Sequence, residues 1–331
     1  MVRIVLMLTI LLSQIFGFSQ TIQLVNSGTK SSFRGLSVVN DKIIWVSGSN
    51  GTVGKSTDGG TNWEWHIIKG FEKTDFRDIE AFDKSNAIIM GIDCPAVMLK
   101  TTDGGNSWKV VYHDTTKGMF LDAMDFKNKK RGVVIGDPLN GRIFLCKGSF
   151  KKNNWKIMDS IERPLLDSGE ACFASSGTNI RFINRKKYIF ITGGKSSHLY
   201  YKGKKIKIPI VQGTESTGAN SIAIKDKKHF IIVGGDFNDK ESSSNNIAIT
   251  TNGGISWKQP ITGPNGYRSS VEYIQYGTWI TCGLTGVDIS HHDGNNFYKI
   301  SDIGFHVCRK AKKGNAVFFA GGGGRLGKLI N

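Results

Sequence analysis

The sequence of 331 residues predicts an all-β fold assembled from copies of one small structural unit. The first observation is a phrase that occurs three times, as STDGGTNW at 56–63, TTDGGNSW at 101–108 and TTNGGISW at 250–257. A phrase that recurs within one chain indicates a fold that repeats a supersecondary unit. The second observation is a series of short runs rich in Val, Ile and Phe that end at Gly, such as IIWVSG and AIIMGI. Such runs are typical of buried strands bounded by loops, and no helical periodicity appears beyond the N-terminus.

The repeated phrase predicts a tight hairpin. Its acidic residue can accept hydrogen bonds from the backbone N–H groups of the turn, and the following Gly pair supplies the positive φ that a hairpin needs. The Trp that ends the phrase begins the next strand and buries a large ring. The residues with this expected structural role are Asp58, Trp63, Asp103, Trp108, Asn252 and Trp257.

The phrase resembles the Asp-box, also called the bacterial neuraminidase (BNR) repeat, whose pattern is S/T-x-D-x-G-x-T/S-W. In families that carry this repeat, it lies on the hairpin between the third and fourth strands of a β-propeller blade, at the outer rim. The resemblance therefore implies a β-propeller, and it makes the phrase a marker of the fold and not of a site.

The spacing of the phrases predicts the number of blades. Trp63 and Trp108 are 45 residues apart, and a degenerate copy ends at Trp155, 47 residues further on. The 102 residues from Trp155 to Trp257 fit two blades, with LYYKGKKIKI as the eroded hairpin between them. SHHDGNNF at 290–297 ends 40 residues after Trp257 and is another weak copy. Six hairpins follow from this pattern.

The C-terminal tail predicts a seventh blade and the way in which the ring closes. The tail from Phe305 has room for three strands, whereas TIQLVNS at 21–27 precedes the first complete blade. We therefore predict seven four-stranded antiparallel blades, with the N-terminal strand completing the last one and covering its edge. The expected inner strands are FRGLSVV, FRDIEAF, FLDAMDF, GEACFAS, GANSIAI, YRSSVEY and FHVCRKA.

Residues 1–19 are typical of a signal peptide. Arg3 precedes an apolar run at 4–12, and small residues stand before a cleavage site at Gln20. The run is shorter than a membrane span requires. We therefore expect an exported protein, periplasmic or secreted, with no transmembrane segment and with residues 20–331 as a single propeller domain.

The net charge of +17 is concentrated in the turns between the first and second strands of several blades. In a propeller these turns share one face with the repeated hairpins, so we expect one basic face. Such a face can attract an acidic protein, an anionic lipid or a glycan, or its lysines can serve only to solvate tight turns. Nucleic acid is not expected, because no strand interleaves aromatic and basic residues. The turns lie at 129–131, 185–187, 225–228 and 310–313.

The five cysteines have no metal-binding spacing, and their odd number argues against a disulfide framework. Four of them lie in apolar strand contexts, which favours small buried thiols. A bridge between Cys282 and Cys308 is the alternative. Cys94, before Pro95 in a loop, is the cysteine that could be exposed.

Aligned inner strands predict a binding site at the mouth of the central channel. Each of these strands carries a polar residue at a similar point, and inner strands line the channel, so these side chains should converge. Three arginines beside a glutamate form a plausible pocket for a carboxylate or an acidic side chain. The predicted ligand-binding residues are Arg34, Arg77, Glu170, Asn220, Arg268 and His306.

The resemblance also raises an enzymatic alternative, because sialidases share the Asp-box propeller and hold the substrate carboxylate with three arginines. Arg34 stands in FRGL where the sialidase pattern has Arg-Ile-Pro, and no Tyr can be assigned as the nucleophile. A sialidase-like glycoside hydrolase or lyase would use Glu170 as a catalytic carboxylate, with Asp78, Asp122 or Asp137 as its partner.

The chain more closely resembles the non-enzymatic Asp-box propellers that are similar to the photosystem II stability and assembly factor. The resemblance rests on the seven-bladed length, on boxes written TTDGGxxW and on the arginines of the channel face. It implies binding or assistance of assembly, and it does not transfer the partner. We expect a monomer without cofactor or metal that holds an acidic protein or glycan, and we lean against an enzyme.

Overall fold

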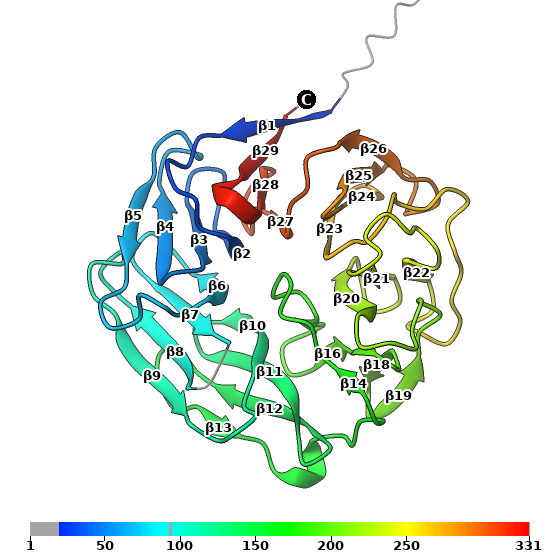
Figure 1. Cartoon of the computed structure of the whole chain (residues 1–331), viewed down its shortest axis with the longest axis horizontal. Coiled ribbons are helices and arrows are strands. Elements are labelled where there is room, and N and C mark those ends of the chain that lie inside the picture. The colour runs from blue at the N-terminus through cyan, green and yellow to red at the C-terminus, as the bar shows by residue number, and fades with distance from the viewer. Residues whose placement is uncertain (1–19, 93–94, 331) are drawn as a thin grey trace, which may run out of the picture.

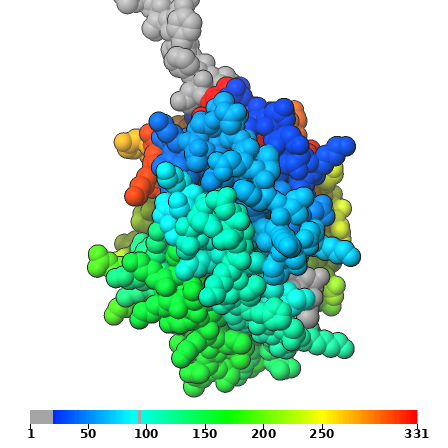
Figure 2. Space-filling view, turned by 90° about the vertical axis from the view of Figure 1, so that its left-hand side faces the viewer, coloured from blue at the N-terminus to red at the C-terminus, as the bar shows by residue number. Residues whose placement is uncertain are grey.

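The structure is a computed structural model that describes residues 20–92 and 95–330. Seven sheets surround a central channel as the blades of a propeller, which confirms the predicted fold (Figure 1). Figure 2 shows the rim of the ring, where the first blade (blue) is followed by the second (cyan) and the third (green). Within the described residues, the helical elements are two short 3₁₀ turns, η1 (Ser160–Glu162) and η2 (Gly322–Gly324). The expected signal peptide and Cys94 lie outside the described residues.

The first three blades begin with the inner strand and end with the outermost strand. Blade one contains β2 (Phe33–Val38), β3 (Ile44–Gly48), β4 (Thr52–Ser56) and β5 (Glu64–Ile67). Blade two contains β6 (Phe76–Ala81), β7 (Ala87–Gly91), β8 (Ala96–Thr101) and β9 (Lys109–Asp114). Blade three contains β10 (Leu121–Asn128), β11 (Arg131–Leu139), β12 (Arg142–Gly148) and β13 (Lys156–Ile157).

The next three blades keep this order, but blade five lacks a regular outermost strand. Blade four contains β15 (Ile180–Phe182), β16 (Tyr188–Ile191), β18 (His198–Tyr201) and β19 (Lys204–Lys207). Blade five contains β20 (Thr217–Ile224), β21 (Phe230–Asp236) and β22 (Ile247–Thr250), and a single bridge from Ile249 to Lys258 stands in place of its outermost strand. Blade six contains β23 (Ser270–Gln275), β24 (Thr278–Gly283), β25 (Gly286–Ser290) and β26 (Tyr298–Ser301).

The seventh blade closes the ring with strands from both ends of the chain, as predicted. It contains β27 (Val307–Lys310), β28 (Val317–Ala320) and β29 (Leu326–Ile330), followed by β1 (Thr21–Val25) as the outermost strand. β1 and β29 pair antiparallel along their whole length, with Thr21 opposite Ile330. The pairing gives hydrogen-bond partners to an edge of β29 that would otherwise be open.

The predicted inner strand of blade four is wrong. Within GEACFAS, Glu170 and Ala171 form the short strand β14, which pairs with β17 (Gly193–Gly194), and the inner strand is β15 further along the chain. The reason lies in the turn after β15, where Asn184 accepts hydrogen bonds from the backbone N–H groups of the two lysines that follow. This Asx turn brings β15 directly back against β16 and leaves the segment 172–179 as a loop.

The hydrophobic core lies between neighbouring blades. One cluster, for example, joins Ile88 and Met98 of blade two to Val134 and Phe144 of blade three. Four cysteines, Cys146, Cys172, Cys282 and Cys308, are buried free thiols. Because each sheet buries both faces against its neighbours, its inner three strands are almost continuously apolar.

The three repeat hairpins (residues 56–63, 101–108 and 250–257) lie where the resemblance implies, after the third strand of a blade. In the second, the Asp103 carboxylate accepts hydrogen bonds from the backbone N–H of Ser107 (3.0 Å) and from two hydroxyl groups. The Trp108 ring N–H donates to Gly105 O (3.1 Å). The N–H of Gly104 reaches the turn between the first two strands of its blade, at Ser85 O (3.0 Å). Hairpins and basic turns therefore share one face, as predicted.

Candidate functional site

A cavity of about 470 Å³ opens at the end of the channel opposite the repeat hairpins. Four of the six predicted ligand-binding residues line it, and they come from four different blades: Arg34, Arg77, Asn220 and His306. Asp137 of β11 lines it as well, together with the segment 171–175. The cavity is therefore built by polar side chains that the ring, and not any single blade, brings together.

Four of the inner strands carry a bulge at the position of the aligned polar residue. The pairing of β2 with β3 shifts register between Phe33 and Gly35, so that Arg34 is the extra residue. The same shift occurs around Arg77, Asp122 and Asn220 in β6, β10 and β20. A bulged residue is released from the alternation of a regular strand, and bulges often redirect a side chain in this way.

Arg34 and Arg77 form the cationic side of the cavity, and their positive charge exceeds the negative charge of the carboxylate that pairs with Arg77. The Arg34 guanidinium donates to Ser32 Oγ (3.2 Å), and within the described residues no carboxylate lies within ion-pair distance of it. Arg77 pairs with Asp75 at the rim, with 2.8 Å between Nε and Oδ2. Burial and the Arg77 charge lower the pKa of Arg34. An anion entering here would meet a partly desolvated guanidinium, which favours a strong charge-assisted bond.

The pKa of His306 is also shifted by the positive charge of the cavity. Burial lowers its pKa to about 3, and the charges of Arg34, Arg325 and Arg77 contribute to the shift. The imidazole is therefore neutral near pH 7 and can donate or accept one hydrogen bond without adding charge.

One aspartate, Asp137, lines the cavity, and a second, Asp122, is buried near it. Asp137 accepts a hydrogen bond from the backbone N–H of Cys172 (3.1 Å), and burial raises its pKa. Asp122 is completely buried, and neither carboxylate oxygen has a hydrogen-bond partner within the described residues. Burial and the neighbouring Asp137 raise the Asp122 pKa well above its ordinary value. Protonation of Asp122 would relieve the cost of an unpaired buried charge.

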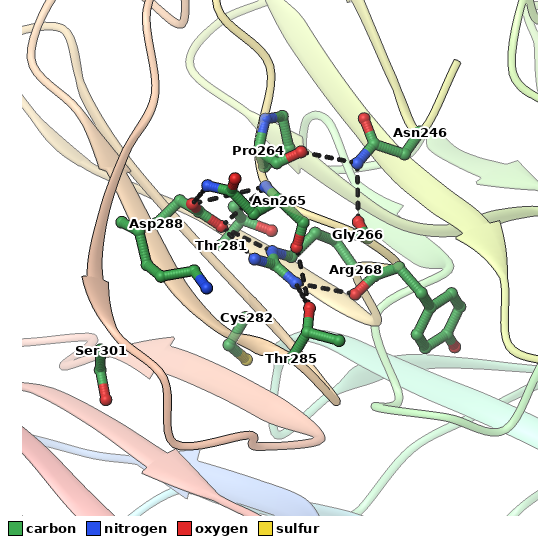
Figure 3. Close-up of polar contacts among 12 residues, drawn as sticks. Asn246, Pro264, Asn265, Gly266, Arg268, Thr281, Cys282, Thr285, Asp288 and Ser301 are labelled. Carbon is green, nitrogen blue, oxygen red and sulfur yellow. Dashed lines mark hydrogen bonds and ion pairs between the residues drawn. The ribbon is translucent and has the colours of Figure 1, made fainter. Parts of the chain in front are cut away.

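Arg268 does not reach the cavity, contrary to the expected convergence. It lies just before β23 and is completely buried, and its guanidinium pairs with the buried carboxylate of Asp288 on β25 (Figure 3). Its Nε lies 2.7 Å from Asp288 Oδ2, and Nη1 donates to Tyr267 O and Thr285 Oγ1. These donors are engaged inside blade six. Arg268 therefore stabilises the fold and does not take part in the cavity.

Glu170 is likewise enclosed, within blade four. Its carboxylate accepts hydrogen bonds from Tyr200, Lys205, Thr192 and other donors, with 2.9 Å from the Tyr200 hydroxyl and 2.9 Å from Lys205 Nζ. Burial alone would raise the Glu170 pKa, but hydrogen bonds from His198, Thr192, the Asp167 backbone N–H and Lys205 lower it to about 2. A carboxylate held ionised by so many donors is poorly suited to act as a general acid.

The group of Asp167, Glu170 and His198 brings three potential metal ligands close together. The Lys205 ammonium already bridges the two carboxylates, at 2.7 Å from Asp167 and 2.9 Å from Glu170. A fixed positive charge in this position fills the role that a cation would take, so the residues present do not fit a metal.

Asp78, the remaining catalytic candidate, is also committed to the fold. Its two oxygens accept the backbone N–H groups of Ile79 (2.8 Å) and Met124 (2.7 Å), and its residue is buried. Burial raises the Asp78 pKa to about 8. Of the four candidate catalytic carboxylates, Asp137 is the one that lines the cavity.

Sequence reasoning missed the apolar part of the cavity. Phe120, Phe173, Phe237 and Tyr267 contribute rings to the wall, and the Tyr267 hydroxyl donates to Asn220 Oδ1 (2.7 Å). Phe120 and Tyr267 stand at the aromatic position that begins five of the seven predicted inner strands. The repetition of that aromatic position was the signal in the sequence that could have indicated this wall.

Comparisons with known proteins agree with this fold. The model of the family described as photosynthesis system II assembly factor YCF48 matches residues 18–117, a range that holds β1 and the first two blades. A comparison with curated proteins gave no match.

Solved structures similar to the chain include two YCF48 propellers and one WD40 propeller. The structure described as YCF48 bound to D1 peptide is 15% identical with a TM-score of 0.65, covering 95% of this chain and 97% of that one. YCF48 from Cyanidioschyzon merolae is 17% identical with a TM-score of 0.65, covering 93% and 98%. The WD40 domain of Doa1 is 14% identical with a TM-score of 0.63, covering 94% and 97%. At these identities the likeness shows the fold.

Proposed function

We propose that the protein is a non-enzymatic binding or assembly-assisting propeller that holds a carboxylate-bearing segment of a partner in the channel-mouth cavity. The observation that carries this proposal is the convergence of Arg34, Arg77 and His306 on one cavity. Besides burial, the Arg77 charge lowers the pKa of Arg34, and the charges of both arginines lower the pKa of His306, which indicates a positive field that an anionic side chain or chain terminus would neutralise.

An acidic protein segment fits this cavity better than a bulky partner surface. The cavity of about 470 Å³ has room for a few side chains, and its aromatic wall can contact their apolar parts. A structure similar in fold is described as YCF48 bound to a D1 peptide, which supports a peptide as the kind of ligand. The D1 peptide is the ligand of that protein, and we do not propose the same peptide as the ligand of this chain. An acidic glycan remains the second ligand that the charges would accept.

Binding is favoured over the hydrolase alternative by the positions of the carboxylates. Glycoside hydrolysis uses two carboxyl groups that face one cleft, about 5 to 10 Å apart. Asp137 lines the cavity, whereas Glu170, Asp78 and Asp122 are buried away from its surface. The proposed role therefore rests on recognition by the arginines, without a chemical step.

Replacement of the two arginines tests the proposal. Partners are recovered by pull-down with the wild-type protein, and the affinity of the recovered partner is then measured for the variants Arg34→Gln and Arg77→Gln. We expect each variant to bind at least about tenfold more weakly, because each removes a charge-assisted bond from a partly desolvated site. Lys227→Gln, at an exposed lysine of a turn on the opposite face, is the control. Unchanged affinity of both cavity variants would exclude the site.

We also propose that the protein is exported after removal of residues 1–19. No helix within the described residues is long and apolar enough to cross a membrane. Expression of the full chain, followed by fractionation and N-terminal sequencing, should give a mature protein that begins at Gln20 outside the cytoplasm. A cytoplasmic protein that retains Met1 would exclude export.

A further inference from the structure

The outer rim between blades three and four carries three neighbouring hollows with basic walls. They have volumes of about 290, 520 and 540 Å³. Two of them share Lys147 and Gly148, and two share Lys186 and Tyr188, so they form one continuous groove. Ten lysines and two arginines line the groove, and Glu162 is the carboxylate among its lining residues. Two of the lysines are already paired, Lys147 with Glu162 and Lys205 with Asp167 and Glu170, which leaves most of the positive charge without a counter-charge. We call this surface the rim groove.

The first section of the rim groove is made by a hairpin that has lost its acidic residue. In GSFKKNNW at 148–155, Phe150 replaces the Asp of the repeated phrase, and Lys151 and Lys152 replace the two Gly. The hairpin nevertheless keeps its place, because the N–H of Lys151 donates to Lys129 O at 3.0 Å, as Gly59 does to Lys42 O in blade one. The fold does not require these lysines, and both are exposed.

The middle section lies between the turns of the two blades. Arg131, Arg185 and Lys186 line it, and all three are exposed. The Arg131 guanidinium donates to the backbone oxygen of Arg185 (2.6 Å), which holds the two cationic turns together. Like charges held side by side without a carboxylate between them raise the local positive potential, and an anion of matching length would neutralise it.

The last section follows β19, whose sequence KKIK has three lysines in four residues. Lysines on an outermost strand also prevent sheets from pairing edge to edge. This need does not fully explain β19, because the outermost strands β9 and β26 contain one lysine each, and β5 and β1 contain none. Among these outermost strands, β19 therefore carries the most lysine.

The aromatic rings of the rim groove carry lysines and leave little ring face for a ligand. The ammonium group of Lys147 lies 5.7 Å from the ring centre of Tyr188, and that of Lys202 lies 4.8 Å from the ring centre of Tyr201. Tyr201 is buried. Proteins that bind single-stranded nucleic acid stack bases on exposed rings, so the rim groove offers charge without stacking platforms.

From these features we infer that the rim groove binds a linear anionic polysaccharide, one that bears uronate or sulfate groups along its length. An extended polymer can follow connected hollows, whereas a flat membrane would touch only their rims. Its charges repeat at regular intervals, which suits a row of lysines, and its sugar rings do not need stacking partners. This site is separate from the channel-mouth cavity and does not depend on the proposed function.

Binding of defined polyanions tests the inference. The full mature protein is titrated with fluorescently labelled alginate and dextran sulfate, and with poly-glutamate and single-stranded DNA of similar charge. The triple variant Lys151→Gln, Lys152→Gln, Lys186→Gln is compared with the wild type. We expect the variant to bind the polysaccharides at least about tenfold more weakly, and with a shallower dependence on salt, since fewer counterions are exchanged.

Two controls separate the rim groove from general charge and from the cavity. Lys227→Gln with Lys228→Gln removes two exposed lysines of a turn on the same face of blade five and should leave polysaccharide binding unchanged. Arg34→Gln with Arg77→Gln should also leave it unchanged. Equal weakening by the blade-five variant and the groove variant would overturn the inference. Tighter binding of poly-glutamate or DNA than of both polysaccharides would also overturn it, in favour of an acidic protein or a nucleic acid.

Discussion

Replacement of Asp288 should destabilise the protein strongly and leave ligand binding unchanged. Asp288 and Arg268 are both completely buried, and Asp288 is the carboxylate that faces the guanidinium. Asp288→Ala removes the two bonds from Arg268 Nε and Nη2, and a third from Asn265 Nδ2 (2.7 Å). The buried guanidinium then has no counter-charge. Breaking a buried ion pair by removing one partner costs about 3–5 kcal/mol of the free energy of unfolding.

Urea unfolding followed by tryptophan fluorescence measures this effect. The double variant Arg268→Met, Asp288→Leu should lose less stability than Asp288→Ala, because it leaves no unpaired buried charge. Asp302→Ala is the control, since its carboxylate is 88% exposed and pairs with Lys299 at the surface; such a pair contributes little. An unchanged midpoint in Asp288→Ala would refute the structural role of the pair. If the Arg268→Ala protein were stable but bound the partner more weakly, Arg268 would be part of the ligand site.

Three further predictions concern closure, pH and the repeat hairpins. Deletion of residues 21–27 should leave β29 with an open edge and cause self-association, which light scattering detects; a monomeric truncated protein of unchanged stability would contradict this. Burial raises the Glu272 pKa from 4.5 to about 7, so the contribution of this group to stability is full below about pH 4.5 and is lost as pH rises through 7. Urea titrations of Glu272→Gln should show a smaller decline than the wild type, because Asp78, whose pKa burial raises to about 8, still contributes to it. The exposed control Glu241→Gln should keep the full decline, and equal declines in Glu272→Gln and the wild type would contradict the prediction. Asp103→Ala should lower the melting temperature. Asp103→Asn should lower it less, because Asn252 accepts the equivalent hydrogen bond from Ser256 N (2.9 Å) in another repeat hairpin. Equal melting temperatures of Asp103→Ala and the wild type would exclude this structural role of Asp103.

The ring could be predicted from the sequence because its signals are local. Each hairpin is a short phrase in which turn residues and a Trp stand at fixed offsets, and even the degenerate copy at 148–155 keeps the same spacing. Closure followed from counting strands, since the tail from Phe305 has three and the segment 21–27 supplies the fourth. Both predictions use patterns that can be found along the chain without knowing which distant residues are in contact.

The site could be predicted only in part because side-chain direction depends on distant partners. Arg34 and Arg268 both follow an aromatic residue at the start of a blade and looked equivalent. Arg34 sits on a bulge and faces the cavity, whereas Arg268 turns toward Asp288, twenty residues away on another strand. Glu170 was misplaced because GEACFAS was assigned to the inner strand, which the structure forms further along the chain as β15. For the two arginines, the direction of the side chain is set by residues that lie far apart in the sequence.

The pairing of β1 with β29 has a consequence for the order in which a ribosome makes the protein. The strand at 21–25 is synthesised long before its partner at 326–330. The first six blades can therefore be complete while β1 still has no partner, and the chain must keep that strand from other contacts throughout synthesis. The ring therefore closes only after residues 326–330 have been made, and a chain that stops before them leaves β1 without a partner and one edge of β28 open.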